Sequence, residues 1–285
     1  MEIIRNIGEM KRIRAAFADK RLTVGLVPTM GALHDGHLSL IERIGSCCDV
    51  RIVSIFVNPI QFGQNEDLDK YPKPFEADCE KAKSAGCDAV FAPLRQDMYP
   101  EGYSTFVDVE NITNGLCGAS RPGHFRGVAT VVLKFFNIIS PACAIFGQKD
   151  AQQVVVLKRM AADLNCNVRI MVAPIVREPD GLAMSSRNAY LTPGERAEAA
   201  MIYGGLTAAA RAYDKGRRSA AHIKDAINEF YNKASRFTVE YVEVVHVQTL
   251  EPLNELDCAA LVAVAVRTKE SKTRLIDNIV LGGEL

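Results

Sequence analysis

The strongest constraint on the fold is a regular alternation of apolar, strand-like runs with amphipathic, helix-like runs over roughly the first 176 residues. The runs LTVGLV (22–27) and VRIVSIFV (50–57) are nearly continuously apolar, which is typical of parallel strands covered on both faces. Between them, HLSLIERIGSCC (37–48) spaces its apolar residues as a helix does. The sequence therefore predicts a β-α-β unit near the N-terminus.

The alternation continues and predicts a Rossmann-like, doubly wound parallel sheet over residues 1–176. Further helix-like stretches are 73–86, 127–139 and 150–164, and further strand-like stretches are 88–93, 143–146 and 168–176. After residue 176 the rhythm changes. Two helix-like stretches, 193–215 and 219–234, precede three β-rich runs at 238–247, 260–268 and 273–281. We therefore predict an α/β fold in two domains, 1–176 and a smaller α+β domain, 177–285.

The composition narrows the class of protein. The 285 residues are 48% hydrophobic and carry 34 Lys plus Arg against 34 Asp plus Glu, so we expect no large field that would gather nucleic acid or an anionic membrane. No segment reaches the ~20 apolar residues that cross a bilayer, and the N-terminus has no leader pattern. The eight cysteines form no C-x-x-C pair. We expect a cytoplasmic protein without structural zinc or disulfides.

The stretch VPTMGALHDGH (27–37) lies where the first strand should give way to a helix. Ligands of an open parallel sheet bind at such turns, because a helix N-terminus points unpaired N–H groups there. Gly31 and Gly36 let the backbone approach a ligand closely, and His34 and His37 add ring donors. The two commonest glycine-rich phosphate loops, G-x-G-x-x-G and G-x-x-x-x-G-K-[ST], are absent. The turn predicts a phosphate site of another kind.

Two other interpretations of the histidine pair stay open at this point. H-x-x-H could supply two metal ligands, but zinc needs three or four and no nearby cluster of Cys, His or acidic residues completes the set. We therefore predict no metal site built from protein ligands. The histidines could also simply cap a turn.

Six blocks of sequence resemble the motifs of a known protein family. They are PTMGALHDGH (28–37), FVNPIQFG (56–63), DLDKYPK (67–73), RPGHFRGVATVV (121–132), FGQKDAQQ (146–153) and MSSRNAYL (184–191). The first is similar to the H-x-G-H signature of the nucleotidyltransferase superfamily, which includes class I aminoacyl-tRNA synthetases. Together, in this order, the blocks resemble the pantothenate synthetase (pantoate–β-alanine ligase) family. Gln148 stands where many relatives have Glu.

The resemblance implies ATP-dependent condensation of (R)-pantoate with β-alanine to pantothenate, AMP and pyrophosphate, through a pantoyl adenylate. Mg²⁺ would enter as MgATP, with few protein ligands because phosphates and waters fill most of its shell. Asp67 and Asp69 are possible outer contacts and are not assigned as ligands. The resemblance also implies a homodimer and a C-terminal domain that acts as a lid.

The resemblance and the chemistry of the reaction together give each residue a role. We expect His37, His34 and Lys149 to act in catalysis. Pantoate would meet Gln61, Gln153 and Asn58, and β-alanine would meet Gln61. ATP would meet Met30, Gly31, Ala32, Leu33, His34, Asp35, Gly36, His37, Gly147, Gln148, Lys149, Asp150, Val176, Met184, Ser185, Ser186 and Arg187.

Several of these residues also have ordinary interpretations. Lys149 and Asp150 could form a solvated pair at the start of a helix, and MSSRN could be a polar linker. Phe56 and Phe62 are candidate pocket walls or plain core residues.

Three other functions remain alternatives. One is a different nucleotidyltransferase of the same superfamily that acts on a phosphorylated small molecule. A tRNA-binding module related to synthetases would need a basic tract that this chain lacks. A purely structural protein would leave the clustered His, Lys and Arg side chains without a use.

Overall fold

The computed structural model describes residues 1–63, 66 and 68–285, which form two compact units. The first unit comprises Met1–Thr113, Gly118–Gly147 and Val156–Ala173, and the second comprises Asn114–Cys117, Gln148–Val155 and Pro174–Leu285. Each unit is described by itself below. The predicted division into domains at residue 176 stays a prediction.

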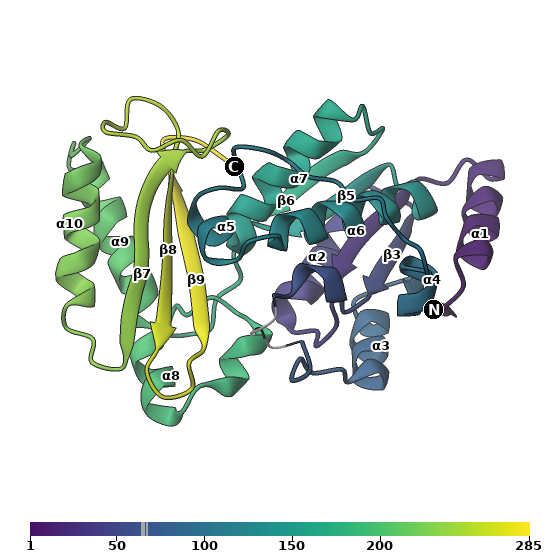
Figure 1. Cartoon of the computed structure of the whole chain (residues 1–285), viewed down its shortest axis with the longest axis horizontal. Helices are drawn as coiled ribbons and strands as arrows, with labels where there is room; N and C mark the ends of the chain where they lie inside the picture. The colour runs from purple at the N-terminus through teal and green to yellow at the C-terminus, as the bar shows by residue number, and fades with distance from the viewer. Residues whose placement is uncertain (64–65, 67) are drawn as a thin grey trace. The chain divides into compact units, whose positions relative to one another are not determined.

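A six-stranded parallel sheet forms the centre of the first unit, in the order β1-β4-β3-β2-β5-β6 (Figure 1). Its strands are β1 (Glu2–Ile4), β2 (Val24–Thr29), β3 (Val50–Ile55), β4 (Ala89–Phe91), β5 (Cys143–Gly147) and β6 (Arg169–Ala173). The predicted Rossmann-like parallel sheet is confirmed. The short edge strand β1 was not among the predicted strands, since three residues are too few to show a periodic pattern.

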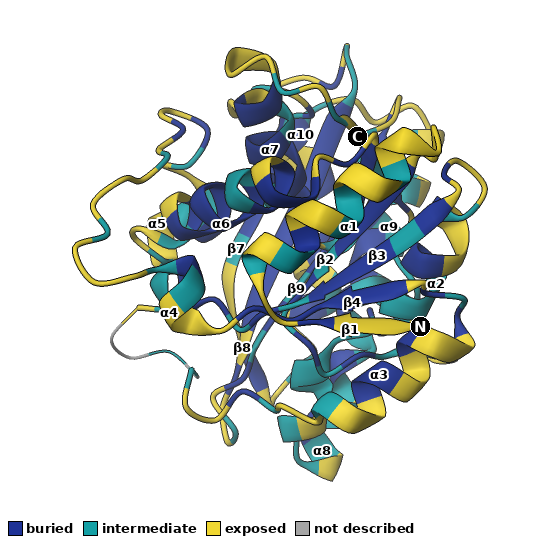
Figure 2. Cartoon of the chain, turned by 90° about the vertical axis from the view of Figure 1, so that its right-hand side faces the viewer, coloured by how far each residue is buried: buried dark blue, intermediate teal, exposed yellow. Residues whose placement is uncertain are grey.

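Helices cover this sheet and turn their polar sides outward. They are α1 (Ile7–Asp19), α2 (Asp35–Ile44), α3 (Phe75–Ser84), α4 (Arg95–Met98) and α6 (His124–Ile139), with a short 3₁₀ helix η1 (Pro59–Gln61). In Figure 2 the strands β2, β3 and β4 are dark blue, whereas α1 and α3 show exposed residues on their outer sides. The continuous apolar strands are therefore buried on two faces, as the sequence pattern indicates.

The strand order reverses between β2 and β5. From β2 the chain moves through β3 to β4 on one side, and from β5 it moves to β6 on the other. β2 pairs with β3 through all six of its residues, but with β5 only at Gly25 and Leu26. Ligands of doubly wound sheets bind beyond the carboxyl ends of the strands at such a reversal. The turns that follow β2 and β5 are therefore the candidate ligand sites of this sheet.

The second unit is built on a three-stranded antiparallel sheet, β7-β8-β9. Its elements are α8 (Pro193–Ala199), α9 (Met201–Asp214), α10 (Ala220–Tyr231), β7 (Phe237–His246), β8 (Ala260–Thr268) and β9 (Arg274–Leu281), with 3₁₀ helices η2 (Gln148–Asp150) and η3 (Ser186–Tyr190). Two more helices, α5 (Leu116–Ser120) and α7 (Ala151–Asp163), contain points where the chain passes between the units. The smaller α+β part is confirmed, although the helix predicted at 193–215 breaks at Ala200.

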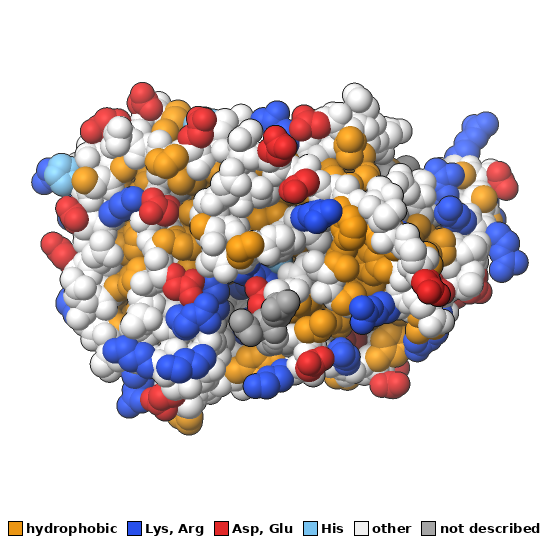
Figure 3. Space-filling view, viewed as in Figure 1, with side chains coloured by type: hydrophobic (Ala, Val, Ile, Leu, Met, Phe, Trp, Pro, Cys, Tyr) orange, Lys and Arg blue, Asp and Glu red, His pale blue; other side chains and the backbone are white. Residues whose placement is uncertain are grey.

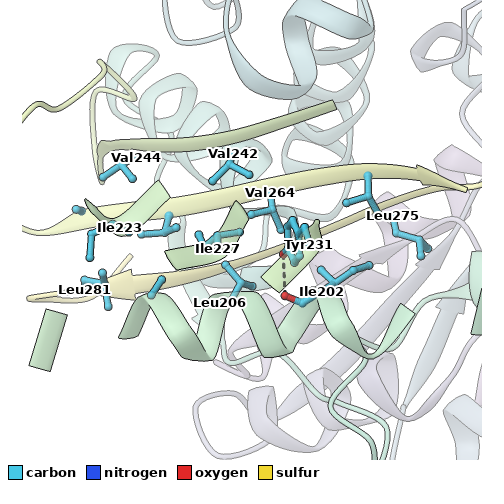
Figure 4. Close-up of a cluster of buried hydrophobic side chains, with 14 of the residues drawn as sticks. Ile202, Leu206, Ile223, Ile227, Tyr231, Val242, Val244, Val264, Leu275 and Leu281 are labelled. Carbon is cyan, nitrogen blue, oxygen red and sulfur yellow. Dashed lines mark hydrogen bonds between the residues drawn. The ribbon is translucent and has the colours of Figure 1, made fainter. Parts of the chain in front are cut away.

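An apolar cluster joins the two long helices of this unit to its sheet (Figure 4). Leu206 of α9, Ile223 and Ile227 of α10 and Val264 of β8 are fully buried. The Tyr231 hydroxyl donates a 2.8 Å hydrogen bond to the carbonyl of Ile202. The buried phenol therefore keeps a polar partner while its ring adds to the core.

Charges of both signs are interspersed on the face of the molecule seen in Figure 3. This mixture agrees with the equal numbers of acidic and basic residues. Within the described part of the chain, none of the helices combines the length and the apolar character that a membrane crossing requires.

Glu195 ties the start of α8 to the turn between β8 and β9. Its carboxylate accepts hydrogen bonds from the backbone N–H groups of Thr192, Glu270 and Ser271 at 3.1, 2.8 and 3.0 Å. Burial alone would raise the pKa of Glu195, but these hydrogen bonds outweigh it and lower the pKa to about 2. An ionised acceptor at this position therefore stabilises the second unit.

Replacing Glu195 by Gln should destabilise the protein at pH 7 by roughly 2 kcal/mol, because an amide cannot accept at both positions. The folded-state pKa lies below the ordinary value of about 4.3, so this contribution is present above pH 4.3 and is lost as the pH falls toward 2. Denaturant unfolding of both proteins at several pH values checks this. A stability difference that stayed constant from pH 7 down to about pH 2 would contradict it.

Candidate active site

The turn after β2 has an unusual backbone. Gly31 and Ala32 follow one another with φ of 85° and 51°, both in the left-handed region that favours glycine. A Cβ atom on Gly31 would come within 2.9 Å of Asp78 Oδ2. The Gly31 N–H donates to Thr29 Oγ1 at 3.2 Å. Glycine is therefore required at position 31 both by the conformation and by the neighbouring carboxylate.

Two side chains of α3 hold this turn. The Asp78 carboxylate accepts from the N–H groups of Ala32 and Leu33 at 2.8 and 2.7 Å, and Lys81 Nζ donates to the Leu33 carbonyl at 2.7 Å. Asp78 is only 1% exposed. The left-handed turn thus has its amides and its carbonyl bound by one helix face, which fixes where α2 begins.

His34 and His37 lie at the N-terminus of α2, as the N-cap and the third helical residue. Their ring centroids are 4.1 Å apart. The His34 N–H donates to His37 Nδ1 at 3.4 Å, so the neutral His37 ring carries its proton on Nε2. His37 can therefore donate from Nε2 to a ligand at the positive end of the helix dipole.

A buried amide network follows β3. Asn58 Nδ2 donates to Gln61 Oε1 at 2.9 Å and to the Gly127 carbonyl at 3.1 Å, and Gln61 Nε2 lies 3.0 Å from Met30 Sδ. The Tyr99 hydroxyl donates to Asn58 Oδ1 at 2.8 Å. The predicted residues Met30, Asn58 and Gln61 are thus brought together in one group.

A second group fixes the backbone of Gln61. Arg121 binds Glu66 through two hydrogen bonds of 2.6 Å and also lies 3.0 Å from His124 Nε2. Arginine can only donate, so Nε2 accepts and the proton resides on Nδ1, which donates to the Gln61 carbonyl at 2.9 Å. Burial alone would raise the pKa of Glu66, but the hydrogen bonds from Arg121 lower it below its ordinary value.

In the second unit, η2 follows directly on β5 and carries Lys149. Lys149 Nζ lies 3.8 Å from Asp150 Oδ2. Asn278 of β9 donates from Nδ2 to the carbonyls of Gln148 and Lys149, both at 3.0 Å. Gln148 Nε2 returns a 3.1 Å hydrogen bond to Asn278 Oδ1. The side chain of Gln148 is thus engaged within this unit, and the backbone under Lys149 is held in place.

The two adjacent glutamines of α7 differ in their partners. Gln152 Oε1 accepts from the Cys117 N–H, and Gln152 Nε2 donates to the Gly115 carbonyl, both at 2.9 Å. The Gln153 side chain has no hydrogen-bond partner among the described residues. Gln152 therefore has a structural role, and a role for Gln153 in ligand binding stays a prediction.

The segment MSSRN is ordered by local hydrogen bonds. The Met184 N–H donates to the Val176 carbonyl at 3.0 Å, which brings two of the predicted ATP contacts side by side. The Ser185 hydroxyl accepts from the Arg187 N–H at 3.3 Å and so caps η3. This segment forms a capped turn rather than an irregular linker.

Residues 2–280 match the family profile described as pantoate-beta-alanine ligase. The chain belongs to this family. It is 51% identical over 282 residues to pantothenate synthetase of Thermotoga neapolitana, a match that covers 99% of this chain and 100% of the relative. A crystal structure of pantothenate synthetase from Thermus thermophilus matches with a TM-score of 0.92 and 43% identity, covering 98% of this chain and 99% of that one.

A second solved member of the pantoate–β-alanine ligase family comes from Francisella tularensis and is complexed with beta-gamma ATP and β-alanine. It matches with a TM-score of 0.80 and 36% identity, covering 98% of this chain and 97% of that chain. The resemblance found in the sequence is confirmed, as is the fold.

The predicted site residues of this family member fall into two groups. The first unit holds the segment from Met30 to His37, together with Asn58, Gln61 and Gly147, and the second unit holds Gln148, Lys149, Asp150, Gln153, Val176, Met184, Ser185, Ser186 and Arg187. Their roles stay predictions. Phe56 packs edge-on against Phe135 in the core, and Phe62 packs edge-on against Tyr71. Asp69 is exposed, and Asp67 lies outside the described residues.

Sequence reasoning missed Asp78, Tyr99, His124 and Asn278. Each of them contacts a predicted residue, but each is separated from it in the sequence by between 41 and 130 positions. Arg121 and His124 do lie within the block RPGHFRG that carried part of the family resemblance. That block was the available signal for them, whereas nothing distinguishes Asp78 from the other acidic residues of α3.

Replacing Asp78 by Asn should loosen the turn, because one of its two N–H partners would then face an amide donor. We expect the amides of residues 31–33 to exchange with deuterium about tenfold faster or more. Glu80→Gln, at an exposed carboxylate of the same helix, is the matched control. Unchanged protection of the turn in Asp78→Asn would show that the carboxylate does not hold it.

Proposed function

We propose that this chain joins (R)-pantoate to β-alanine at the expense of ATP, forming pantothenate, AMP and pyrophosphate. The observation that carries the proposal is the family match along residues 2–280. The paired imidazoles at the N-terminus of α2 support it, because they provide donors for a polyphosphate at the edge of the sheet where nucleotides bind.

In the first step, a carboxylate oxygen of pantoate attacks the α-phosphorus of ATP and pyrophosphate leaves. The attacking group is already ionised at neutral pH, so no general base is needed. Catalysis then depends on positioning and on stabilising the charge of the phosphates. The product of this step is pantoyl adenylate.

The charge on the phosphates is met by three side chains. His37 donates from Nε2 to the departing pyrophosphate, and His34 donates to the triphosphate beside it. Lys149 adds a full positive charge. Its backbone is held by Asn278, which limits the reorganisation needed when the phosphates arrive.

The remaining predicted ATP contacts supply backbone and polar groups. The turn from Met30 to Gly36 and the residues Gly147 and Gln148 approach the phosphates through their main chain. Asp150 accepts from the ribose hydroxyls, and Val176 and Met184 pack near the adenosine. Ser185, Ser186 and Arg187 hold and then release pyrophosphate, as part of a C-terminal domain that acts as a lid.

Pantoate carries hydroxyl groups on a branched apolar body, and amide side chains suit such a ligand. Gln61 and Gln153 bind pantoate, and Asn58 holds the amide of Gln61. Gln61 also lies near β-alanine. In the second step the neutral amine of β-alanine attacks the acyl carbon, the C–O bond to phosphate breaks, and AMP leaves with the bonding electrons.

Magnesium is expected to accompany ATP. Among the described residues, no group of three or more His, Cys, Asp or Glu side chains is placed to hold a metal ion. A magnesium ion bound with ATP takes most of its ligands from phosphate oxygens and water and needs few from the protein. When bound, Mg²⁺ neutralises part of the phosphate charge. A homodimer and a cytoplasmic location stay predictions from the sequence.

The direct test of the first step is isotope exchange. With Mg²⁺, ATP and pantoate but no β-alanine, label from pyrophosphate should appear in ATP, because the adenylate forms before the amine is needed. Adding β-alanine should then release AMP. Exchange that strictly requires β-alanine would refute a free adenylate step. Exchange supported by a phosphorylated alcohol but not by pantoate would favour a nucleotidyltransferase instead.

Lys149→Ala should slow this exchange by about 10²-fold or more, the usual cost of removing one donor to a transition state. Lys215→Ala is the control, since Lys215 is exposed at the end of α9. Near-normal exchange in Lys149→Ala would remove Lys149 from the catalytic set.

A further inference from the structure

The side chain of Gln61 ends in an amide, whose oxygen and N–H₂ group are nearly identical in shape. Rotating the amide by 180° exchanges a donor for an acceptor at the position that meets a ligand. The backbone of Gln61 is already fixed, because its carbonyl accepts from His124 Nδ1 at 2.9 Å. Hydrogen bonds to the side chain therefore decide which end faces outward.

The Gly127 carbonyl sets the first orientation in this group. A carbonyl can only accept, so the atom of Asn58 that lies 3.1 Å from it must be the amide nitrogen. The same nitrogen faces Gln61 at 2.9 Å, which requires the oxygen of Gln61 on that side. The Gln61 N–H₂ group is consequently turned away from Asn58, toward Met30.

Tyr99 completes the orientation. Its hydroxyl donates to Asn58 Oδ1 at 2.8 Å, and Asn58 is 1% exposed. Burial raises the pKa of Tyr99, so the phenol keeps its proton and can donate. The ring is held separately by Phe56, Tyr103 and Lys134. Removing the hydroxyl alone therefore leaves the ring contacts in place.

We infer that Tyr99 is a positioning residue which, acting through Asn58, keeps the N–H₂ end of the Gln61 amide directed at pantoate. This inference rests on the proposed function, in which Gln61 binds pantoate. Gln61 then recognises an acceptor atom of the substrate, such as a hydroxyl oxygen. Without its Tyr99 partner, Asn58 keeps the hydrogen bond to the Gly127 carbonyl but loses the one donor that binds its oxygen. Its amide is then held less firmly, and the polarity of the Gln61 amide is fixed less strictly.

Tyr99→Phe tests this directly. We expect the KM for pantoate to rise about tenfold, because the free energy of roughly one hydrogen bond, which orients the Gln61 amide, is lost. The KM for ATP, which Gln61 does not contact in the proposed function, should stay within about twofold of wild type. Tyr103→Phe is the matched control: it makes the same chemical change on the neighbouring ring, and its pantoate KM should not change. Equal increases in the KM values for pantoate and ATP in Tyr99→Phe would indicate a merely structural role.

Two further variants test whether Tyr99 acts through Asn58 and Gln61 or only stabilises the local structure. In Asn58→Asp the carboxylate can only accept a hydrogen bond, so the Gln61 amide should rotate and present its oxygen to pantoate. The KM for pantoate should then rise more than in Tyr99→Phe. In a Gln61→Ala background, adding Tyr99→Phe should have little further effect on kcat/KM for pantoate, because the group through which Tyr99 acts is gone. Fully additive effects would overturn the inference.

The wild-type protein provides the check on the underlying function. If wild type shows no pantoate-dependent turnover, the proposed function fails. If wild type turns over pantoate and Tyr99→Phe has wild-type KM values, the function stands and the positioning role of Tyr99 is wrong.

Discussion

The turn after β2 must place two consecutive residues, Gly31 and Ala32, in the left-handed region, and the buried carboxylate of Asp78 binds the amides of Ala32 and Leu33. Without this acceptor, the buried N–H group of Leu33 and the half-buried one of Ala32 would lack partners, at a cost of about 1 to 3 kcal/mol for the buried group. The position of α2, and with it the position of His34 and His37, depends on this contact. A single carboxylate from α3 thus sets the geometry of the turn at which we propose that the phosphates bind.

A second set of contacts orients the amide of Gln61, which we propose binds pantoate. The Gly127 carbonyl, Asn58 and Tyr99 fix the polarity of the Gln61 amide, while His124 fixes its backbone. Gly127 is suited to this position because a Cβ atom there would lie 2.5 Å from the Ile60 carbonyl oxygen. In the proposed function, close packing of α6 on η1 is therefore part of the recognition of pantoate. The same helix contributes to the core and to the substrate site.

The sequence predicted the parts that depend on local pattern. Continuous apolar strands and amphipathic helices indicated the parallel sheet, and the glycine and histidine residues after β2 indicated a phosphate site. The contact between Asn58 and Gln61 was also accessible, since they are three residues apart. The contacts of Asp78 and Tyr99 could not be predicted from the sequence. Their partners lie 45 and 41 residues away and become neighbours only when α3 and α4 pack. The roles of Lys149 and Gln153 came from the family resemblance rather than from any local pattern.

In the proposed reaction, the carboxylate of pantoate becomes bonded to the α-phosphorus of ATP before the amide forms. Pantoate labelled with ¹⁸O in its carboxylate tests this most directly, with the oxygen content of the products read by mass spectrometry. We expect one ¹⁸O atom in the phosphate of AMP and none in pyrophosphate, since the C–O bond breaks when β-alanine attacks the acyl carbon. Label in pyrophosphate, or AMP without label, would contradict it.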